Sequence, residues 1–267
     1  MDALLVDIDG VLTVGWEPLP GAVEALHRVR EAHLPIRLLT NTTSRTRASI
    51  AETLTNVGFP VFPEEILTAP ALTGAYLAEH HPRGRCLLLS HGDVSADLAG
   101  WGVQFVPATA AAEDLLDEPI DVVVVGGAGP GFDYRTLDLL FSQLQRGAAL
   151  VAMHRNLFWR TKAGLQLDTG AFLLGLEQAA GVPAVVVGKP APAFFQAALA
   201  DLDVEPANAL MVGDDIEADV LSAQAAGVTG VLVRTGKYTE TTLERATGTP
   251  DHVIDSFADI PALLNLS

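Results

Sequence analysis

Two carboxylates end an apolar stretch near the start of the chain. Residues 4–13 read LLVDIDGVLT, so Asp7 and Asp9 are separated by one residue and Gly10 follows directly. Side chains at positions i and i+2 of an extended strand share a face. Two like charges that close favour protonation of each other unless a cation lies between them. The pattern fits either a strand that runs into an Asp-Gly turn or a metal-bound catalytic pair.

Three other apolar runs also end in short polar segments. These are TNTTS at residues 40–44, GKP at 188–190 and GDDIEAD at 213–219. Their hydroxyl, amide, lysine and carboxylate groups are those that hold a phosphoryl group beside a divalent cation. If the runs are parallel strands, their carboxyl ends meet along one edge of a sheet, where such sheets bind ligands. The four segments together predict one phosphoryl-transfer site.

The carboxylates of these segments predict a nucleophile, a proton donor and a metal site. A carboxylate such as Asp7 can attack phosphorus and form an aspartyl-phosphate that water later hydrolyses. A hard cation such as Mg²⁺ offsets the repulsion between the two anions, and Asp7 and Asp214 are its natural carboxylate ligands. Asp9 is placed to protonate the leaving alcohol and to deprotonate the attacking water, and its backbone carbonyl could also reach the metal.

Donors for the phosphate oxygens come from the two shorter segments. Thr40, Asn41 and Thr42 supply neutral donors from their backbone amides and side chains, and Lys189 supplies a positive charge. Only three of the 16 basic residues are lysines, so a lysine at a strand end indicates a function. Thr40 and Asn41 could also cap a helix expected at residues 44–54.

Two further aspartates lie in the fourth segment. Asp219 is expected to support the site from behind, by holding metal-bound water or by orienting Lys189. Asp215 has two interpretations, a water-mediated contact with the metal or the N-cap of the next helix. The residues alone leave both open.

The elements that must position these groups alternate along the chain. Continuous apolar runs typical of parallel strands covered on both faces occur at residues 3–8, 36–40, 86–90, 121–126, 149–153, 184–188, 209–214 and 230–236. Helical periodicity occurs between them, at residues 20–33, 133–147, 170–181, 191–202 and 216–227. The glycines at 126–132 do not have the spacing of a dinucleotide-binding fingerprint, so a loop is expected there. The alternation predicts an α/β fold.

The composition excludes some classes of partner. The 267 residues carry a net charge of −17, and 49% of them are hydrophobic. Such a surface repels a polyanion, so nucleic acid is not expected as a partner. A small phosphorylated substrate can still bind where local groups are arranged for it, because salt screens the global field beyond roughly 8–10 Å.

The remaining composition signals concern the compartment. The single cysteine, Cys86, lies in an apolar run and is expected in the core. No apolar run approaches the ~20 residues that span a bilayer, and no targeting segment is recognisable. The sequence therefore predicts no membrane association and a cytoplasmic protein.

The order DIDGVLT, TNTT, GKP and GDDIEAD resembles the haloacid dehalogenase superfamily of phosphatases over nearly the whole chain. Within it, the combination is similar to the branch (subfamily IIA) that contains the NagD-type, phosphoglycolate, pyridoxal-phosphate and phospholysine/phosphohistidine phosphatases. Residues 212–238 are especially similar to the phospholysine phosphohistidine inorganic pyrophosphate phosphatases. The resemblance implies a Rossmannoid core with a parallel sheet. It also implies the roles given above to Asp7, Asp9, Thr40, Lys189 and Asp214.

The long separation between TNTT and GKP implies an inserted domain. It holds three strand candidates and at least three helices, more than one crossover connection needs. The resemblance implies a C2-type α/β cap, which we place at residues 80–181, with the core at 1–79 and 182–267. Two copies of the chain could associate through this cap as a homodimer.

One segment of the predicted cap is rich in basic and aromatic residues. Residues 153–170 read MHRNLFWRTKAGLQLDTG. The segment fits a solvated basic hairpin. It also fits a surface from which Asn156, Lys162 or Asp168 faces the substrate.

These observations predict a Mg²⁺-dependent phosphatase that acts on a small phosphorylated metabolite through an aspartyl-phosphate. The same residues could instead hydrolyse inorganic pyrophosphate or phosphoramidates such as phospholysine and phosphohistidine. A binding module that retains the fold without turnover is the alternative from another class.

Overall fold

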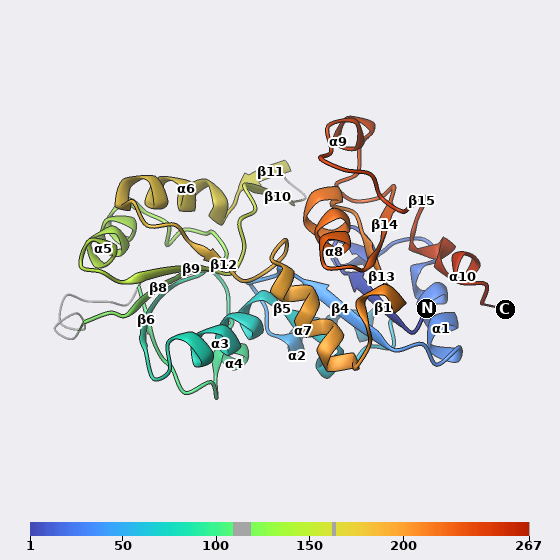
Figure 1. The fold of residues 1–267 in the computed structure, drawn as a ribbon, viewed down its shortest axis with the longest axis horizontal. Helices are drawn as coiled ribbons and strands as arrows, with labels where there is room; N and C mark the ends of the chain where they lie inside the picture. Colours follow the sequence, from blue (N-terminus) through green and yellow to red (C-terminus); the bar gives the residue numbers. More distant parts are fainter. Residues whose placement is uncertain (109–118, 162–163, 267) are drawn as a thin grey trace. The chain divides into compact units, whose positions relative to one another are not determined.

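The computed structural model describes residues 1–108, 119–161 and 164–266 and divides the chain into two compact units. Unit 1 comprises Met1–Thr40, Arg47–Leu67 and Lys189–Ser267, and unit 2 comprises Asn41–Thr46 and Thr68–Gly188. Both units are α/β, as predicted (Figure 1).

Unit 1 is built on a six-stranded sheet in the order β15-β14-β13-β1-β4-β5. Its strands are β1 (Ala3–Asp7), β4 (Ile36–Thr40), β5 (Ile66–Thr68), β13 (Ala209–Gly213), β14 (Thr229–Val233) and β15 (His252–Ile254). The pairs β1–β4, β1–β13, β13–β14 and β14–β15 are parallel. The chain builds outward from β1 through β4 to β5, then continues from the other side of β1 with β13. The switch point of this doubly wound sheet, where a ligand crevice is expected, lies between β1 and β13.

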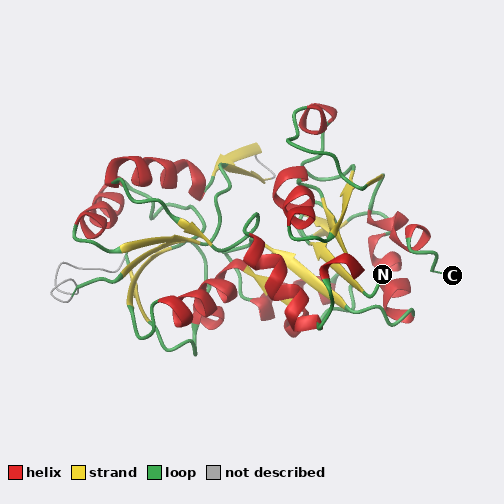
Figure 2. Cartoon of the chain, in the orientation of Figure 1, coloured by secondary structure: helices red, strands yellow, loops and turns green. Residues whose placement is uncertain are grey.

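Helices cover both faces of this sheet, which explains why its strands are apolar throughout (Figure 2). On one face, Val6, Leu38 and Val212 pack in a core with α1 (Ala22–Glu31), α2 (Arg47–Asn56) and α10 (Ile260–Leu263). On the other face, Arg37 of β4 pairs with Asp201 of α7 (Pro192–Leu202). Leu232 of β14 packs there against the π-helical turn η4 (Ile216–Leu221), which continues into α8 (Ser222–Ala225).

The smaller elements of unit 1 are short. They are the antiparallel pair β2 (Thr13–Val14) and β3 (Glu17–Pro18), the helix α9 (Glu240–Glu244), and the 3-10 turns η1 (Pro63–Glu65), η3 (Pro206–Asn208) and η5 (Phe257–Asp259). The β2–β3 hairpin directly follows the DIDG segment, and its two-residue turn is Gly15 and Trp16, both with positive φ. Such a turn matches the twist of the strands that it joins.

Unit 2 has a five-stranded parallel sheet in the order β12-β9-β8-β6-β7. Its strands are β6 (Arg85–Leu89), β7 (Gln104–Pro107), β8 (Val122–Val125), β9 (Ala149–Ala152) and β12 (Val185–Val186). Its helices are α3 (Ala69–His80), α4 (Ser95–Leu98), α5 (Tyr134–Gln145) and α6 (Thr169–Ala180), and β10 (Phe158–Thr161) pairs with β11 (Gly164–Leu167). Cys86 of β6 is buried, as expected.

The units differ from the predicted domain ranges at three places. The segment Asn41–Thr46, the helix α3 and the strand β12 fall in unit 2, although the predicted core included residues up to 79 and from 182. The hydroxyl of Thr68, the N-cap of α3, donates to the carboxylate of Asp97 in α4 over 3.1 Å. This buried bond and the packing of α3 on α4 account for the assignment of α3.

Candidate active site

The strand register of unit 1 brings the ends of β4, β1 and β13 together. Asp7, the last residue of β1, pairs with Leu39, and Thr40 is the next residue of β4. On the other side Val6 pairs with Val212, so Asp214 follows the end of β13 beside Asp7. The predicted convergence of strand ends therefore occurs at the switch point of the sheet.

Lys189 forms ion pairs with two carboxylates at this point. Its Nζ lies 2.5 Å from Oδ1 of Asp7 and 2.7 Å from Oδ1 of Asp219. All three residues are buried, with Lys189 exposed by 3%. Burying a charge is costly unless it is paired, so each of these groups needs the others. Asp219 thus lies where it can orient Lys189, which is one of its two predicted roles.

Asp214 is buried beside this triad with only one carboxylate oxygen satisfied. Its Oδ2 accepts a hydrogen bond from the backbone amide of Lys237 over 2.7 Å. Its Oδ1 is buried and has no hydrogen-bond partner among the residues that the structure describes. An unsatisfied buried acceptor is unusual in a folded protein and indicates a position that binds a ligand.

Two glycines make room for the Asp214 carboxylate. Gly10 has φ +94° and Gly236 has φ +59°, a region that side chains rarely adopt. A Cβ atom would lie 2.0 Å from Oδ2 of Asp214 at Gly10 and 1.9 Å from it at Gly236. Any side chain at either position would displace this carboxylate.

Burial governs the titration of these groups. Loss of hydration raises the pKa of Asp7 to about 7, against the lowering effect of Lys189. Burial also raises the pKa of Asp214, and the charges of Asp7 and Asp219 raise it further. Burial disfavours protonated Lys189, but Asp219 and Asp7 outweigh it and hold its pKa above the usual value. The acidic cluster is therefore short of positive charge at neutral pH.

These features fit a divalent metal ion. Oxygens of Asp7, Asp214 and Asp219 lie within 4.8 Å of one another, and carboxylate oxygens are the ligands that hard cations prefer. The unsatisfied Oδ1 of Asp214 needs a partner, and a cation would also relieve the repulsion that raises the pKa values. Both carboxylate oxygens of Asp219 have partners, Oδ1 the Nζ of Lys189 and Oδ2 the backbone amide of Asp215 over 3.2 Å, so Asp7 and Asp214 are the carboxylates best placed to bind metal.

Asp9 differs from Asp7 in being exposed. Its pKa is raised because the surrounding protein displaces water, while Lys237 and the backbone amide of Gly15 in the β2–β3 turn act in the opposite direction. Its carboxylate lies outside the group of Asp7, Asp214 and Asp219 described above. A raised pKa and exposure suit a group that exchanges protons with a substrate.

Asp215 is the N-cap of η4, the second of its two interpretations. Its Oδ1 accepts from the amide of Ala218 over 3.0 Å, and its Oδ2 pairs with Nζ of Lys237 at 3.1 Å. The helix-capping interpretation of Thr40 and Asn41 is wrong, because the helix α2 begins only at Arg47.

The other predicted substrate contacts belong to unit 2. The side-chain Oδ1 of Asn41 lies close to Gly188, since a Cβ atom added at Gly188 would be 2.6 Å from it. Asn156 donates its backbone amide to Nδ1 of the buried His154. Asp168 caps α6 through the amide of Thr169. Thr42 is half-buried in the same segment as Asn41. Lys162 lies outside the described residues. The substrate contacts of these residues stay predictions.

The segment from Thr235 to Lys237 is not among the predicted site residues. It lies at the end of the run 230–236 and reads TGK. It supplies the amide that binds Asp214, the glycine beside Asp214 and, in Lys237, a second positive charge near the carboxylates. The signal that identified GKP, a glycine and a lysine directly after a predicted strand, is also present here and could have located it.

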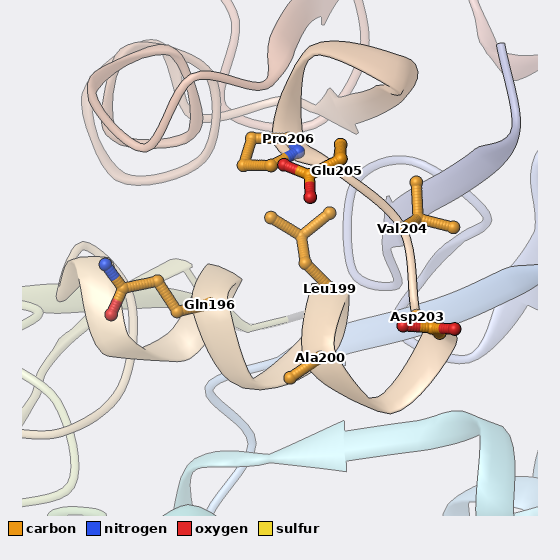
Figure 3. Close-up of a pocket in the computed structure, with 7 residues that line it drawn as sticks. All are labelled: Gln196, Leu199, Ala200, Asp203, Val204, Glu205 and Pro206. Atoms are coloured by element: carbon orange, nitrogen blue, oxygen red, sulfur yellow. The ribbon is translucent and has the colours of Figure 1, made fainter.

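A second pocket of unit 1 has different chemistry. It is lined by Gln196, Leu199, Ala200, Asp203, Val204, Glu205 and Pro206, on α7 and the turn after it (Figure 3). This turn precedes β13, so the pocket lies toward the amino ends of the strands. Its charged residues are both acidic, which does not suit a phosphorylated ligand.

The fold and the site define a doubly wound α/β protein with an acidic, lysine-containing centre at its switch point. Two family profiles match the chain, "Haloacid dehalogenase-like hydrolase" at residues 4–104 and "HAD-hydrolase-like" at 186–260. The chain is 37% identical over 257 residues to haloacid dehalogenase-like hydrolase domain-containing protein 2 of Rattus norvegicus, covering 96% of this chain and 93% of that protein. The chain belongs to the haloacid dehalogenase-like hydrolase family and is a hydrolase.

Two further relatives are named phosphatases. The phospholysine phosphohistidine inorganic pyrophosphate phosphatase of Xenopus laevis is 33% identical over 264 residues, 96% of this chain and 92% of that protein. A solved glycerol phosphate phosphatase from Mycobacterium tuberculosis, in complex with calcium, has a TM-score of 0.84 at 29% identity, covering 97% of this chain and 74% of that chain. The predicted resemblance to this superfamily of phosphatases is confirmed. No helix among the described parts of the chain is long and apolar enough to cross a membrane.

Proposed function

We propose that this hydrolase is a Mg²⁺-dependent phosphatase that cleaves a small phosphate monoester through a phosphorylated Asp7. The observation that carries the proposal is the pairing of Asp7 with Lys189 beside the unsatisfied Oδ1 of Asp214. A nucleophilic carboxylate, a buried cation for the phosphate and a carboxylate oxygen that can bind metal are the minimum that this reaction requires. The glycerol phosphate phosphatase with calcium supports both the substrate class and a divalent metal.

The Mg²⁺ ligands are the carboxylates of Asp7 and Asp214 and the carbonyl of Asp9. When bound, the ion neutralises charge between the attacking carboxylate and the phosphoryl oxygens. Gly10 and Gly236 keep the Asp214 carboxylate in place, and the amide of Lys237 occupies its other oxygen. The Asp214 carboxylate is therefore held through one oxygen, which leaves the other to bind the metal.

In the first step a carboxylate oxygen of Asp7 attacks phosphorus. A bond forms between Asp7 and phosphorus as the bond from phosphorus to the ester oxygen breaks. Asp9 donates its proton to this oxygen, so the alcohol leaves neutral. The raised pKa of Asp9 favours the protonated form that this step needs.

In the second step water hydrolyses the aspartyl-phosphate. Asp9, now a carboxylate, accepts a proton from the water as its oxygen attacks phosphorus. The bond between phosphorus and Asp7 breaks, and phosphate and free Asp7 are released. Because Asp9 returns to its protonated form, the cycle closes with no net proton consumed by the protein.

Lys189 and Thr40 bind the phosphate oxygens in this mechanism. Lys189 remains charged because two carboxylates surround it, and Asp219 keeps it in place when Asp7 becomes phosphorylated. Thr40 offers its hydroxyl and amide from the end of β4. Asn41, Thr42 and Asn156 are the proposed contacts from unit 2.

The second candidate function is hydrolysis of pyrophosphate or a phosphoramidate. The relative from Xenopus laevis, whose name includes those substrates, favours it. The chemistry at Asp7 would be unchanged, since only the leaving group differs.

A substrate panel tests the proposal and separates the candidates. Phosphate release is measured from phosphate monoesters, pyrophosphate and a phosphoramidate, with Mg²⁺ and with chelator, for the wild type and Asp7→Asn. We expect release from monoesters that requires both Mg²⁺ and Asp7. Release that survives either change would refute the mechanism, and no release from any compound would favour the binding module.

A further inference from the structure

The turn after β14 holds the loop that carries Asp9. The hydroxyl of Thr235 donates a hydrogen bond to the carbonyl of Gly10, 225 residues away in the sequence. Thr235 is half-buried. Among the described residues, the bond to Gly10 is the one side-chain hydrogen bond that Thr235 makes to the site. This bond restrains the loop directly.

Gly10 is the residue of this loop that most needs such a restraint. It has φ +94°, and its amide donates to the carbonyl of Thr13 over 2.7 Å. Glycine has many accessible conformations, so a glycine peptide without a hydrogen bond to its carbonyl can rotate. A rotation at Gly10 would move its direct neighbour Asp9, because the Asp9–Gly10 peptide is joined at the Gly10 Cα to the Gly10–Val11 peptide, which contains the bonded carbonyl.

Two other contacts hold the same loop. Gly236 packs against Gly10, where a Cβ atom at Gly236 would lie 2.6 Å from the Gly10 Cα. The Gly15 amide bonds to the Asp9 carboxylate from the hairpin turn. The hydrogen bond from the Thr235 hydroxyl thus joins the turn after β14 to the Asp9 loop.

We propose that Thr235 is a positioning residue that binds the Gly10 carbonyl and so keeps the neighbouring Asp9 in place for proton transfer to the leaving group. The inference rests on the proposed function, in which Asp9 is the proton donor. Proton transfer requires hydrogen-bond geometry between donor and leaving oxygen, so a small displacement of Asp9 has a large effect on that step. Lys189 and Thr40, the proposed phosphate ligands, lie outside this loop, and the assays use saturating Mg²⁺ because the Asp9 carbonyl is a proposed metal ligand.

Two aryl esters of similar size separate these effects. The 4-nitrophenolate anion leaves without a proton, whereas phenolate, like the tyrosine side chain with its pKa of about 10, benefits from one. The ratio kcat/KM reports the steps up to phosphorylation of Asp7. It is measured with p-nitrophenyl phosphate and phenyl phosphate for the wild type, Thr235→Val, Thr235→Ala and Thr235→Ser.

We expect Thr235→Val and Thr235→Ala to lower kcat/KM for phenyl phosphate about ten-fold and for p-nitrophenyl phosphate less than about two-fold. Thr235→Ser keeps the hydroxyl and should retain the wild-type ratio. The exposed Thr241→Val is the control for threonine loss in the same region. Equal losses with both esters, failure of both hydroxyl-free variants to fold, or no loss would overturn the positioning role. A wild type inactive on both esters would instead refute the proposed function.

Discussion

The Nζ of Lys189 lies 2.5 Å from Oδ1 of Asp7, and the two residues are 182 positions apart in the sequence. Both are buried, and the same Nζ contacts Asp219. This single cation therefore holds the proposed nucleophile and supporting carboxylate together at the switch point of the sheet.

Loss of Lys189 should abolish most activity and lower stability. Lys189→Met removes the charge that binds phosphate and leaves buried carboxylates unpaired, which costs about 3–5 kcal/mol of unfolding free energy. We expect kcat/KM to fall at least about 100-fold. Denaturant unfolding and steady-state assays with p-nitrophenyl phosphate measure the two effects.

Arg37→Met is the matched control for this substitution. It breaks the ion pair between Arg37 and Asp201, which is partly exposed, so it should cost at most about 1 kcal/mol and leave kcat/KM unchanged. Similar losses of activity in both variants would argue against a specific role of Lys189.

Asp214→Asn should remove the response to metal. The asparagine can still accept from the Lys237 amide, but it lacks the charge that a Mg²⁺ ion needs. We expect Mg²⁺ to raise the melting temperature of the wild type by a few degrees and not that of the variant. Equal stabilisation of both proteins by Mg²⁺ would place the metal elsewhere.

The metal-free protein should lose stability as the pH rises from about 4 to about 7. The pKa of Asp7 is raised from 3.8 to about 7 by burial, so the folded state keeps a proton that the unfolded state releases in this range. Stability falls wherever the unfolded state binds fewer protons, so the melting temperature with chelator should be higher at pH 5 than at pH 8.

Asp7→Asn tests the origin of this pH dependence. The variant cannot release that proton, so its melting temperature should change less between pH 5 and pH 8. Groups whose pKa is lowered, such as Asp251, titrate below this range and do not contribute to it. An unchanged slope in Asp7→Asn would assign the effect to another group.

Gly236→Ala should weaken metal binding. The new Cβ atom would lie 1.9 Å from Oδ2 of Asp214, so the carboxylate must move away from its present position. We expect the Mg²⁺ affinity measured by calorimetry to fall at least about ten-fold. Gly181→Ala is the control, because Gly181 has φ +69° and no atom of the described residues lies within 4 Å of its Cβ position. If both variants bind Mg²⁺ equally, the close packing at Asp214 does not matter for the metal.

The strands that could be predicted from the sequence are mostly buried on both faces, with β12 as the exception because Val185 is exposed. Each of the eight apolar runs contains a strand, and the loop at 126–132 has neither helix nor strand. The strands that were not predicted, such as β15 and the β2–β3 hairpin, are short and partly exposed, so they contain few consecutive apolar residues. The strand ends then located Asp7, Thr40, Lys189 and Asp214 because parallel sheets bind ligands at one edge.

The contacts missed join segments far apart in the chain. The bond from Thr235 to Gly10 depends on the order of β1, β13 and β14, and so does the bond from the Lys237 amide to Asp214. Asp215 could equally have capped a helix or faced a metal, because both uses need only a carboxylate at the end of a strand.

The most direct test of the central claim is to trap the phosphorylated enzyme. The wild type and Asp9→Asn are mixed with p-nitrophenyl phosphate and Mg²⁺, quenched with acid, and analysed by peptide mass spectrometry. We predict one added phosphoryl group on the peptide that contains Asp7, more abundant in Asp9→Asn because dephosphorylation is slower, and absent from Asp7→Asn. Turnover without any phosphorylated peptide, or with the phosphoryl group on another residue, would contradict the proposed role of Asp7.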